Sequence, residues 1–269
     1  MRRLTPVVST IALVACAPSE APRVDLPVIV DGSGVVPVTN DLGWTVELST
    51  ARVAIRDLEF TTAGEIDERR FAPGTWLLGL LLPSAHAHPG HYQGGEIVGE
   101  LPGDFVLDFI AGSGETLGVA TLIATDYTAA NFELRRADEL ATDDPLHGHT
   151  AWLAGTASKD GQQIAFTVAI DSPIDRELVG APFETTVTVD SDFSIALQLL
   201  TLDPYELDTL FDGLDFAALD LADGVDDGQL DLVDPELVLD QPQALQDGYN
   251  LLRRTFQTHD HFDLIIVDP

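Results

Sequence analysis

The chain has 269 residues and carries 45 acidic side chains against 13 basic ones, which gives a formal net charge of −32 at pH 7. This balance excludes nucleic acid as a partner, because contacts to phosphates need clustered lysine and arginine. Cys16 and Met1 are the only sulfur-containing residues, so the body of the chain offers no disulfide and no soft sulfur ligand. The acidity is typical of adaptation to a salty medium or of a field that attracts cations, and both interpretations stay open.

The N-terminus has the pattern of an export signal. Two arginines precede an apolar stretch at residues 4–15, which is too short to span a bilayer. The stretch ends in LVAC at residues 13–16, which resembles the lipobox of bacterial lipoproteins. The resemblance implies a signal peptide at 1–15, acylation of Cys16, and a membrane partner reached through that lipid. It places the protein on the periplasmic face of the outer membrane or on the cell surface, with Ala17 weakly favouring the outer membrane. An ordinary secretory signal with a coincidental cysteine is the alternative.

Alternating apolar residues predict a mainly β chain. Residues 16–34 read as a tether that includes a first edge strand, and 35–269 as one domain. Alternation over 44–60 indicates one long strand with bulges, or two strands joined near Ser49 and Thr50. The longest apolar run, 76–82, predicts a buried strand, and an Asp160-Gly161 turn predicts a tight hairpin. Further strands are predicted around 105–109, 119–123, 132–134, 152–157, 164–170, 187–189, 195–199 and 262–267.

Helical patterns appear only towards the C-terminus. Asp203 and Pro204 suit a helix start, and the apolar positions after them predict a helix through about Leu214. A second helix is predicted at about 242–256, where apolar residues recur at helical spacing. Together these patterns predict a β-sandwich with one or two short α-helices near the C-terminus.

The seven histidines are confined to three short groups, each containing the element H-x-H. In an extended strand, residues two apart point to the same face and can converge on one ion. Histidine is the commonest metal ligand, and a site without sulfur favours Zn(II), Cu(II) or Ni(II) over Cu(I), with Zn(II) or Cu(II) as the expected ion. We therefore predict a metal site from the following histidines: His86, His88, His91, His147, His149, His259 and His261. Three aspartates stand beside them as carboxylate ligands or as acceptors for the imidazoles: Asp143, Asp144 and Asp260.

Other readings of these residues remain. The histidines could be solvated surface groups, or a pH sensor without metal. Asp223, Asp226, Asp227 and Asp231 surround two glycines and are weak Ca(II) candidates, although turn chemistry explains them equally well. We expect a lipid-anchored protein that stores, buffers or delivers a transition metal. A histidine-ligated copper or zinc enzyme, and a structural surface lipoprotein whose fold a metal stabilises, are the alternatives.

Overall fold

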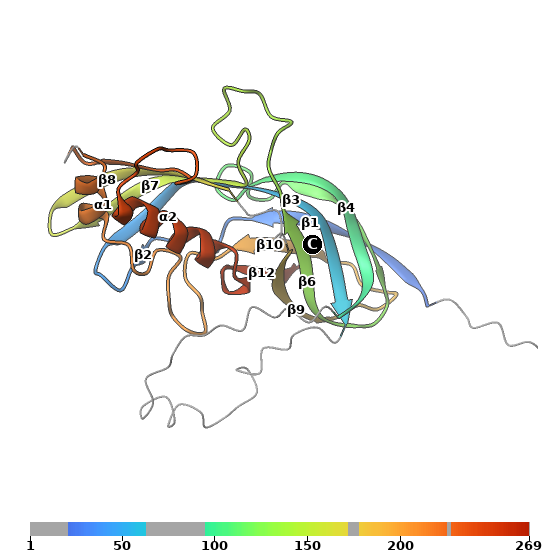
Figure 1. Cartoon of the computed structure of the whole chain (residues 1–269). Coiled ribbons are helices and arrows are strands. Elements are labelled where there is room, and N and C mark those ends of the chain that lie inside the picture. The colour runs from blue at the N-terminus through green and yellow to red at the C-terminus, as the bar shows by residue number, and fades with distance from the viewer. Residues whose placement is uncertain (1–20, 63–94, 172–177, 225–226, 269) are drawn as a thin grey trace, which may run out of the picture.

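The computed structural model describes residues 21–62, 95–171, 178–224 and 227–268, and the expected strand at 76–82 lies outside them. Twelve strands of the described chain belong to one mixed sheet (Figure 1). The strands are β1 (Arg23–Asp31), β2 (Val38–Thr39), β3 (Thr45–Thr62), β4 (Glu96–Asp108), β5 (Thr116–Ile123), β6 (Asp126–Leu134), β7 (Ala151–Lys159), β8 (Gln162–Ile170), β9 (Leu178–Thr186), β10 (Ser194–Leu199), β11 (Gln229–Leu232) and β12 (Phe262–Val267). The helices are α1 (Phe216–Ala222), α2 (Gln243–Phe256) and the short 3₁₀ helix η3 (His259–His261).

Strand β3 holds the sheet together. It pairs with β4 along one side, and with β7 and then β6 along the other. Its register shifts between Leu48 and Thr50 and again between Arg56 and Leu58, where Asp57 has a φ of 45°. Extra residues of this kind bend a strand and increase its twist. The structure thus confirms one long bulged strand and excludes two joined strands.

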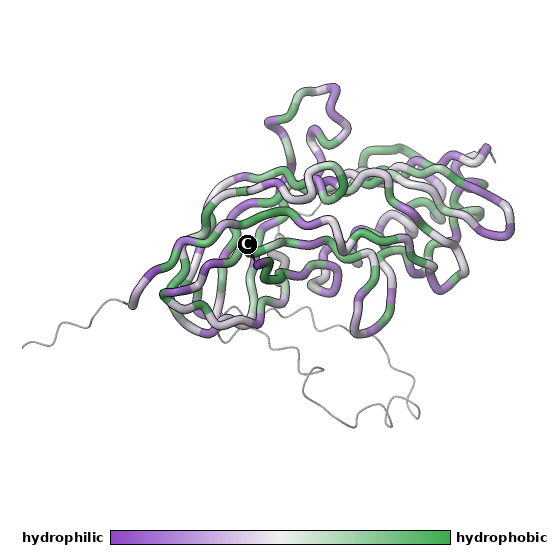
Figure 2. The backbone as a smooth tube through the Cα atoms, turned by 180° about the vertical axis from the view of Figure 1, so that it is seen from behind, coloured by the Kyte–Doolittle hydropathy of each residue, from purple (hydrophilic) through white to green (hydrophobic). Residues whose placement is uncertain are grey.

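The bent sheet curls over a single large core. Its path runs β11-β8-β7-β3-β4-β5-β1-β10-β12, and β9 is attached to β3 through β6. Phe132 of β6 packs edge-on against Phe262 of β12, with ring centroids 5.0 Å apart. Hydrophobic and hydrophilic residues alternate along the strands, as Figure 2 shows, because successive side chains point to opposite faces. The mainly β class with helices near the C-terminus is confirmed.

The segment 16–34 is not simply a tether with an edge strand. Residues 23–31 form β1, an interior strand that pairs with β5 on one side and with β10 on the other. Leu26, Val28 and Val30 alternate into the core and are each at most 1% exposed. Burial of these alternating side chains fixes the register of β1 between β5 and β10.

Two local predictions are confirmed at the hairpin and at α2. Asp160 and Gly161 have φ of 50° and 85° and join β7 to β8, as a primed turn requires. Helix α2 buries one stripe that includes Leu245, Tyr249 and Leu252. No helix in the described part of the chain is long and apolar enough to cross a membrane.

The predicted helix at 203–214 is wrong. The chain there folds into successive turns, and α1 begins only at Phe216, capped by the Asp215 carboxylate. Leu207 has a φ of 64°, which a right-handed helix does not allow. Leu210, Phe211 and Leu214 are buried from this irregular segment, so core packing accounts for the apolar spacing that resembled a helix.

Candidate metal centre

Several predicted site residues lie outside the described part of the chain. These are Cys16, His86, His88, His91 and Asp226, together with the side chain of His259. The lipidation site and the first histidine group therefore stay predictions.

The His147–His149 group lies in a loop and not in a strand. Gly148 between them has a φ of 76°, so the two imidazoles do not share the face of an extended backbone. The Nδ1 atom of His149 faces the Asp171 carboxylate at 3.2 and 3.3 Å. The Nδ1 atom of His147 is buried and has no hydrogen-bond partner in the described structure.

The aspartates predicted beside this pair have other roles. Asp144 accepts two hydrogen bonds from Arg52, at 2.7 and 3.1 Å. These bonds from the guanidinium lower the pKa of Asp144, so its carboxylate is held as the partner of a fixed cation. Asp143 is exposed.

The His259–His261 group forms η3, just before β12. A 3₁₀ helix has three residues per turn, so positions two apart diverge, and the extended geometry expected for H-x-H is wrong here too. Asp260, between them, is half-buried. His261 is only 1% exposed, and its Nδ1 atom lies 2.9 Å from the carbonyl oxygen of Leu200.

The aspartates weighed as calcium ligands are spread over a turn and a strand. Asp223 ends α1, and Asp227 accepts a hydrogen bond from the backbone N–H of Gln229. Asp231 accepts a hydrogen bond from the Thr167 hydroxyl across the β11–β8 pair. These contacts are those of turn and strand residues.

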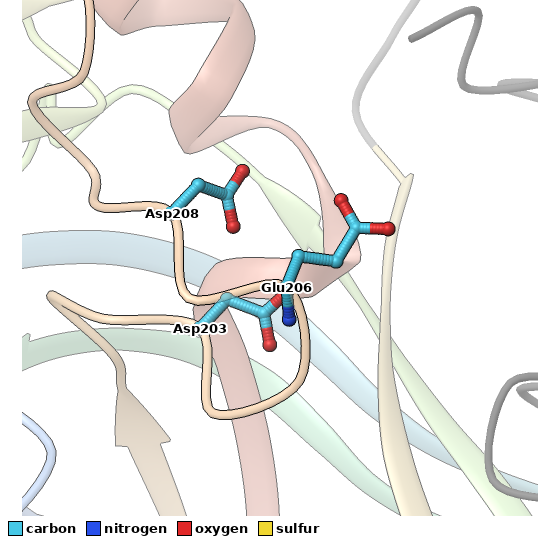
Figure 3. Close-up of side chains that lie close together, drawn as sticks. All are labelled: Asp203, Glu206 and Asp208. Carbon is cyan, nitrogen blue, oxygen red and sulfur yellow. The ribbon is translucent and has the colours of Figure 1, made fainter. Parts of the chain in front are cut away.

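A different group of acidic residues converges in the loop after β10. Asp203, Glu206 and Asp208 each place a carboxylate oxygen within 4.8 Å of the others (Figure 3). Within the described residues, no other group of three or more histidine, cysteine or carboxylate side chains meets this condition. The predicted histidines therefore do not gather with one another in the part of the chain that is described.

Backbone hydrogen bonds close this loop on itself. The N–H of Leu210 donates to the Thr201 carbonyl at 3.0 Å, and the N–H of Asp203 donates to the Asp208 carbonyl at 2.9 Å. Asp203 is 2% exposed, and its carboxylate accepts hydrogen bonds from the N–H groups of Tyr205 at 2.8 Å and Glu206 at 3.2 Å. The turn thus brings three carboxylates from six consecutive residues onto one side.

Burial makes this concentration of negative charge costly. It raises the pKa of Asp208, the charge of a nearby His261 opposes the rise, and Asp203 and Glu206 add to it. The Oδ1 atom of Asp208 is buried without a hydrogen-bond partner in the described structure. A buried acceptor of this kind is unfavourable unless something donates to it or binds it.

Sequence reasoning missed Asp203, Glu206 and Asp208 and found only their neighbour His261. The signal was present as D-x-x-E-x-D in residues 203–208, but Asp203-Pro204 was interpreted as the start of a helix. On a helix, positions 203 and 208 would point in different directions, and no site would have been inferred.

No protein-family model and no curated protein matches the chain. Among solved structures, the chain is similar to MbnP from Methylosinus trichosporium, with 11% sequence identity and a TM-score of 0.28. The match covers 66% of this chain and 76% of that chain. A likeness of this size carries no argument about function.

Proposed function

We propose that this protein is an exported metal-binding protein that holds a divalent cation at Asp203, Glu206 and Asp208. The observation that carries the proposal is the convergence of three carboxylates, one of which keeps a buried oxygen without a hydrogen bond. Like charges this close repel one another, and a cation between them removes the repulsion. A divalent ion supplies the missing partner for the Asp208 oxygen and neutralises the repulsion.

The charge of the whole chain supports the same proposal. A net charge of −32 creates a field that concentrates cations near the surface. The acidic loop then provides a fixed set of oxygen ligands within that field. Storage, buffering or delivery of the ion are the roles that such a site suits.

The place of action is also part of the proposal. The LVAC pattern ending at Cys16 supports export and a lipid anchor, so the ion would be met outside the cytoplasm. The histidines of the first group, His86, His88 and His91, would add nitrogen ligands for further ions.

The experiment is a calorimetric titration of the full chain with Zn(II) and with Ca(II), on the wild type and on Asp208→Asn. The substitution keeps the size of the side chain and removes its charge, so we expect one saturable binding event to be lost. Asp190→Asn is the matched control, since Asp190 is exposed in another turn and changes the net charge equally.

Thermal unfolding provides a second readout. A ligand at 100 times its Kd stabilises the folded state by about 2.7 kcal/mol, so saturating metal should raise the Tm of the wild type and of Asp190→Asn. The proposal fails if Asp208→Asn binds and is stabilised as the wild type is.

A further inference from the structure

An apolar groove lies between helices α1 and α2, which pack side by side at one end of the molecule (Figure 1). The groove has a volume of about 180 Å³. The buried residues Leu214, Leu219 and Gly248 line its floor, and the exposed residues Ala218 and Ala244 line its sides. It is therefore an apolar hollow that opens to solvent.

The sizes of the residues along the two helices explain the hollow. A Cβ atom at Gly248, in the middle of α2, would lie 2.9 Å from a methyl group of Leu219. The glycine thus lets α1 approach the backbone of α2, although glycine inside a helix costs about 1 kcal/mol relative to alanine. Beside this contact, the short side chains of Ala218 and Ala244 leave the space between the helices open.

The volume of the groove indicates what it can hold. Sites for drug-sized ligands and cofactors usually measure about 300–1,000 Å³, so this groove is too small for them. An engineered apolar cavity of about 150 Å³ holds benzene, so about 180 Å³ suits one leucine, methionine or phenylalanine side chain. Protein partners commonly bind through a single apolar side chain of this kind, seated in a desolvated pocket.

Two carboxylates set the charge that an occupant must carry. Asp215 and Asp247 are exposed and line the groove, and none of the residues that line it is basic. The Asp215 carboxylate accepts a hydrogen bond from Nε1 of Trp44 at 3.3 Å, and the Asp247 carboxylate accepts one from the Gln243 amide at 2.8 Å. These bonds hold the carboxylates in place, so a lysine or arginine beside the apolar anchor would find them positioned.

We propose that this groove is the docking site for a basic amphipathic helix of a partner protein. The helix inserts one apolar side chain between α1 and α2 and pairs its lysines or arginines with Asp215 and Asp247. Grooves of this kind read apolar anchors at helical spacing, while the basic face supplies the charge complementarity. The net charge of −32 attracts such a helix from a distance, and the groove determines where it binds.

The probe is a synthetic 14-residue helical peptide with leucines on one face and lysines on the other, labelled with a fluorophore. A second peptide keeps the lysines and carries glutamine in place of leucine. Fluorescence anisotropy measures the binding of both peptides to the full chain at about 0.15 M salt, where the Debye length is about 8 Å and distant charges are screened. We expect the leucine peptide to bind at least 10-fold more tightly than the glutamine peptide.

Two variants locate the binding. Ala244→Phe fills the groove from an exposed position and should weaken the leucine peptide by on the order of 10-fold or more, as the loss of an anchor contact does. Asp247→Asn removes one carboxylate and should weaken it several-fold. Ala111→Phe and Asp190→Asn make the same changes at exposed positions of other turns and should leave binding unchanged. Circular dichroism and thermal unfolding establish that each variant folds.

A measurement on the unsubstituted chain does not depend on the folding of a variant. In amide NMR spectra, the leucine peptide should shift the signals of α1 and α2 most. Equal binding of the two peptides, no binding of the leucine peptide, full binding to Ala244→Phe, or shifts concentrated away from these helices would each overturn the inference. None of the residues that line the groove belongs to the acidic loop, so these outcomes leave the proposed metal site untouched.

Discussion

Asn40 joins the turn before β3 to the segment that follows the acidic loop. Its side-chain amide donates to the carbonyls of Phe211 at 3.0 Å and Leu214 at 2.9 Å. Its side-chain oxygen accepts the N–H groups of Leu42 at 3.1 Å and Trp44 at 2.9 Å. Asn40 is 4% exposed, so these four bonds are made out of contact with water.

Replacing Asn40 with alanine should destabilise the protein by about 3 kcal/mol. Three of the four partners belong to the buried residues Trp44, Phe211 and Leu214, and each unsatisfied buried group costs about 1 kcal/mol or more. The Leu42 N–H lies in an exposed residue and can bond to water. Folded domains are stable by about 5–15 kcal/mol, so the loss is a large fraction of the total.

Urea unfolding followed by tryptophan fluorescence measures the effect, and the midpoint should fall while the slope m stays constant. Asn40→Asp keeps the two accepted hydrogen bonds but turns a carboxylate oxygen towards the two carbonyls. It should therefore destabilise the protein at least as much as Asn40→Ala does. Glu47→Gln, at an exposed position of β3, should change stability by less than about 0.5 kcal/mol. A loss below about 1 kcal/mol for Asn40→Ala would refute the reasoning.

Three further predictions concern the scaffold. Hydrogen bonding from Arg135 lowers the pKa of Glu139, so the pair stabilises the fold above the ordinary pKa of 4.5 and loses this contribution as the pH falls through the lowered value. Glu139→Gln should therefore lower the stability of the protein at neutral pH and make its stability fall less steeply as the pH is lowered. Urea midpoints measured across this pH range will show the effect, and a profile unchanged from the wild type would refute a stabilising role for the Arg135–Glu139 pair. Gly155→Ala should destabilise far more than Gly114→Ala in thermal unfolding, because a Cβ at 155 would lie 2.3 Å from a backbone oxygen of β3. At 114 the Cβ would meet nothing within 4 Å, so the cost there is limited to the backbone strain of alanine at a φ of 90°; equal effects would contradict this packing. Leu207→Asn should raise the metal-free stability by about 1 kcal/mol, because asparagine tolerates a positive φ and Leu207 is 70% exposed; a lower Tm would count against strain at this residue.

The strands and turns of the sheet were predictable where residues close together in the sequence determine them. Alternation located β3 and its bulge, the Asp160-Gly161 turn placed the β7–β8 hairpin, and an apolar stripe located α2. The interior strand β1 was missed because Pro27 and Ile29 separate the buried residues Leu26, Val28 and Val30, so no alternation of polar and apolar residues marks it. The two strands that flank β1 also lie far away in the sequence.

The acidic loop shows why the site was harder to predict. An aspartate that caps a helix and one that caps an isolated turn make the same first hydrogen bonds, so Asp203 supports both interpretations. Two features distinguish the isolated turn from a helix: the positive φ of Leu207, and the hydrogen bond from the Leu210 N–H to the Thr201 carbonyl. Local sequence propensity reveals neither of them. The position of His261 depends on the β10–β12 register, a contact between residues about 60 apart in the sequence.

Anomalous diffraction at the zinc absorption edge, from crystals of the full chain grown with Zn(II), tests the central claim most directly. The proposed function predicts an anomalous peak between the carboxylates of Asp203, Glu206 and Asp208. A map with no peak in this loop, while zinc occupies sites elsewhere in the same crystal, would contradict it.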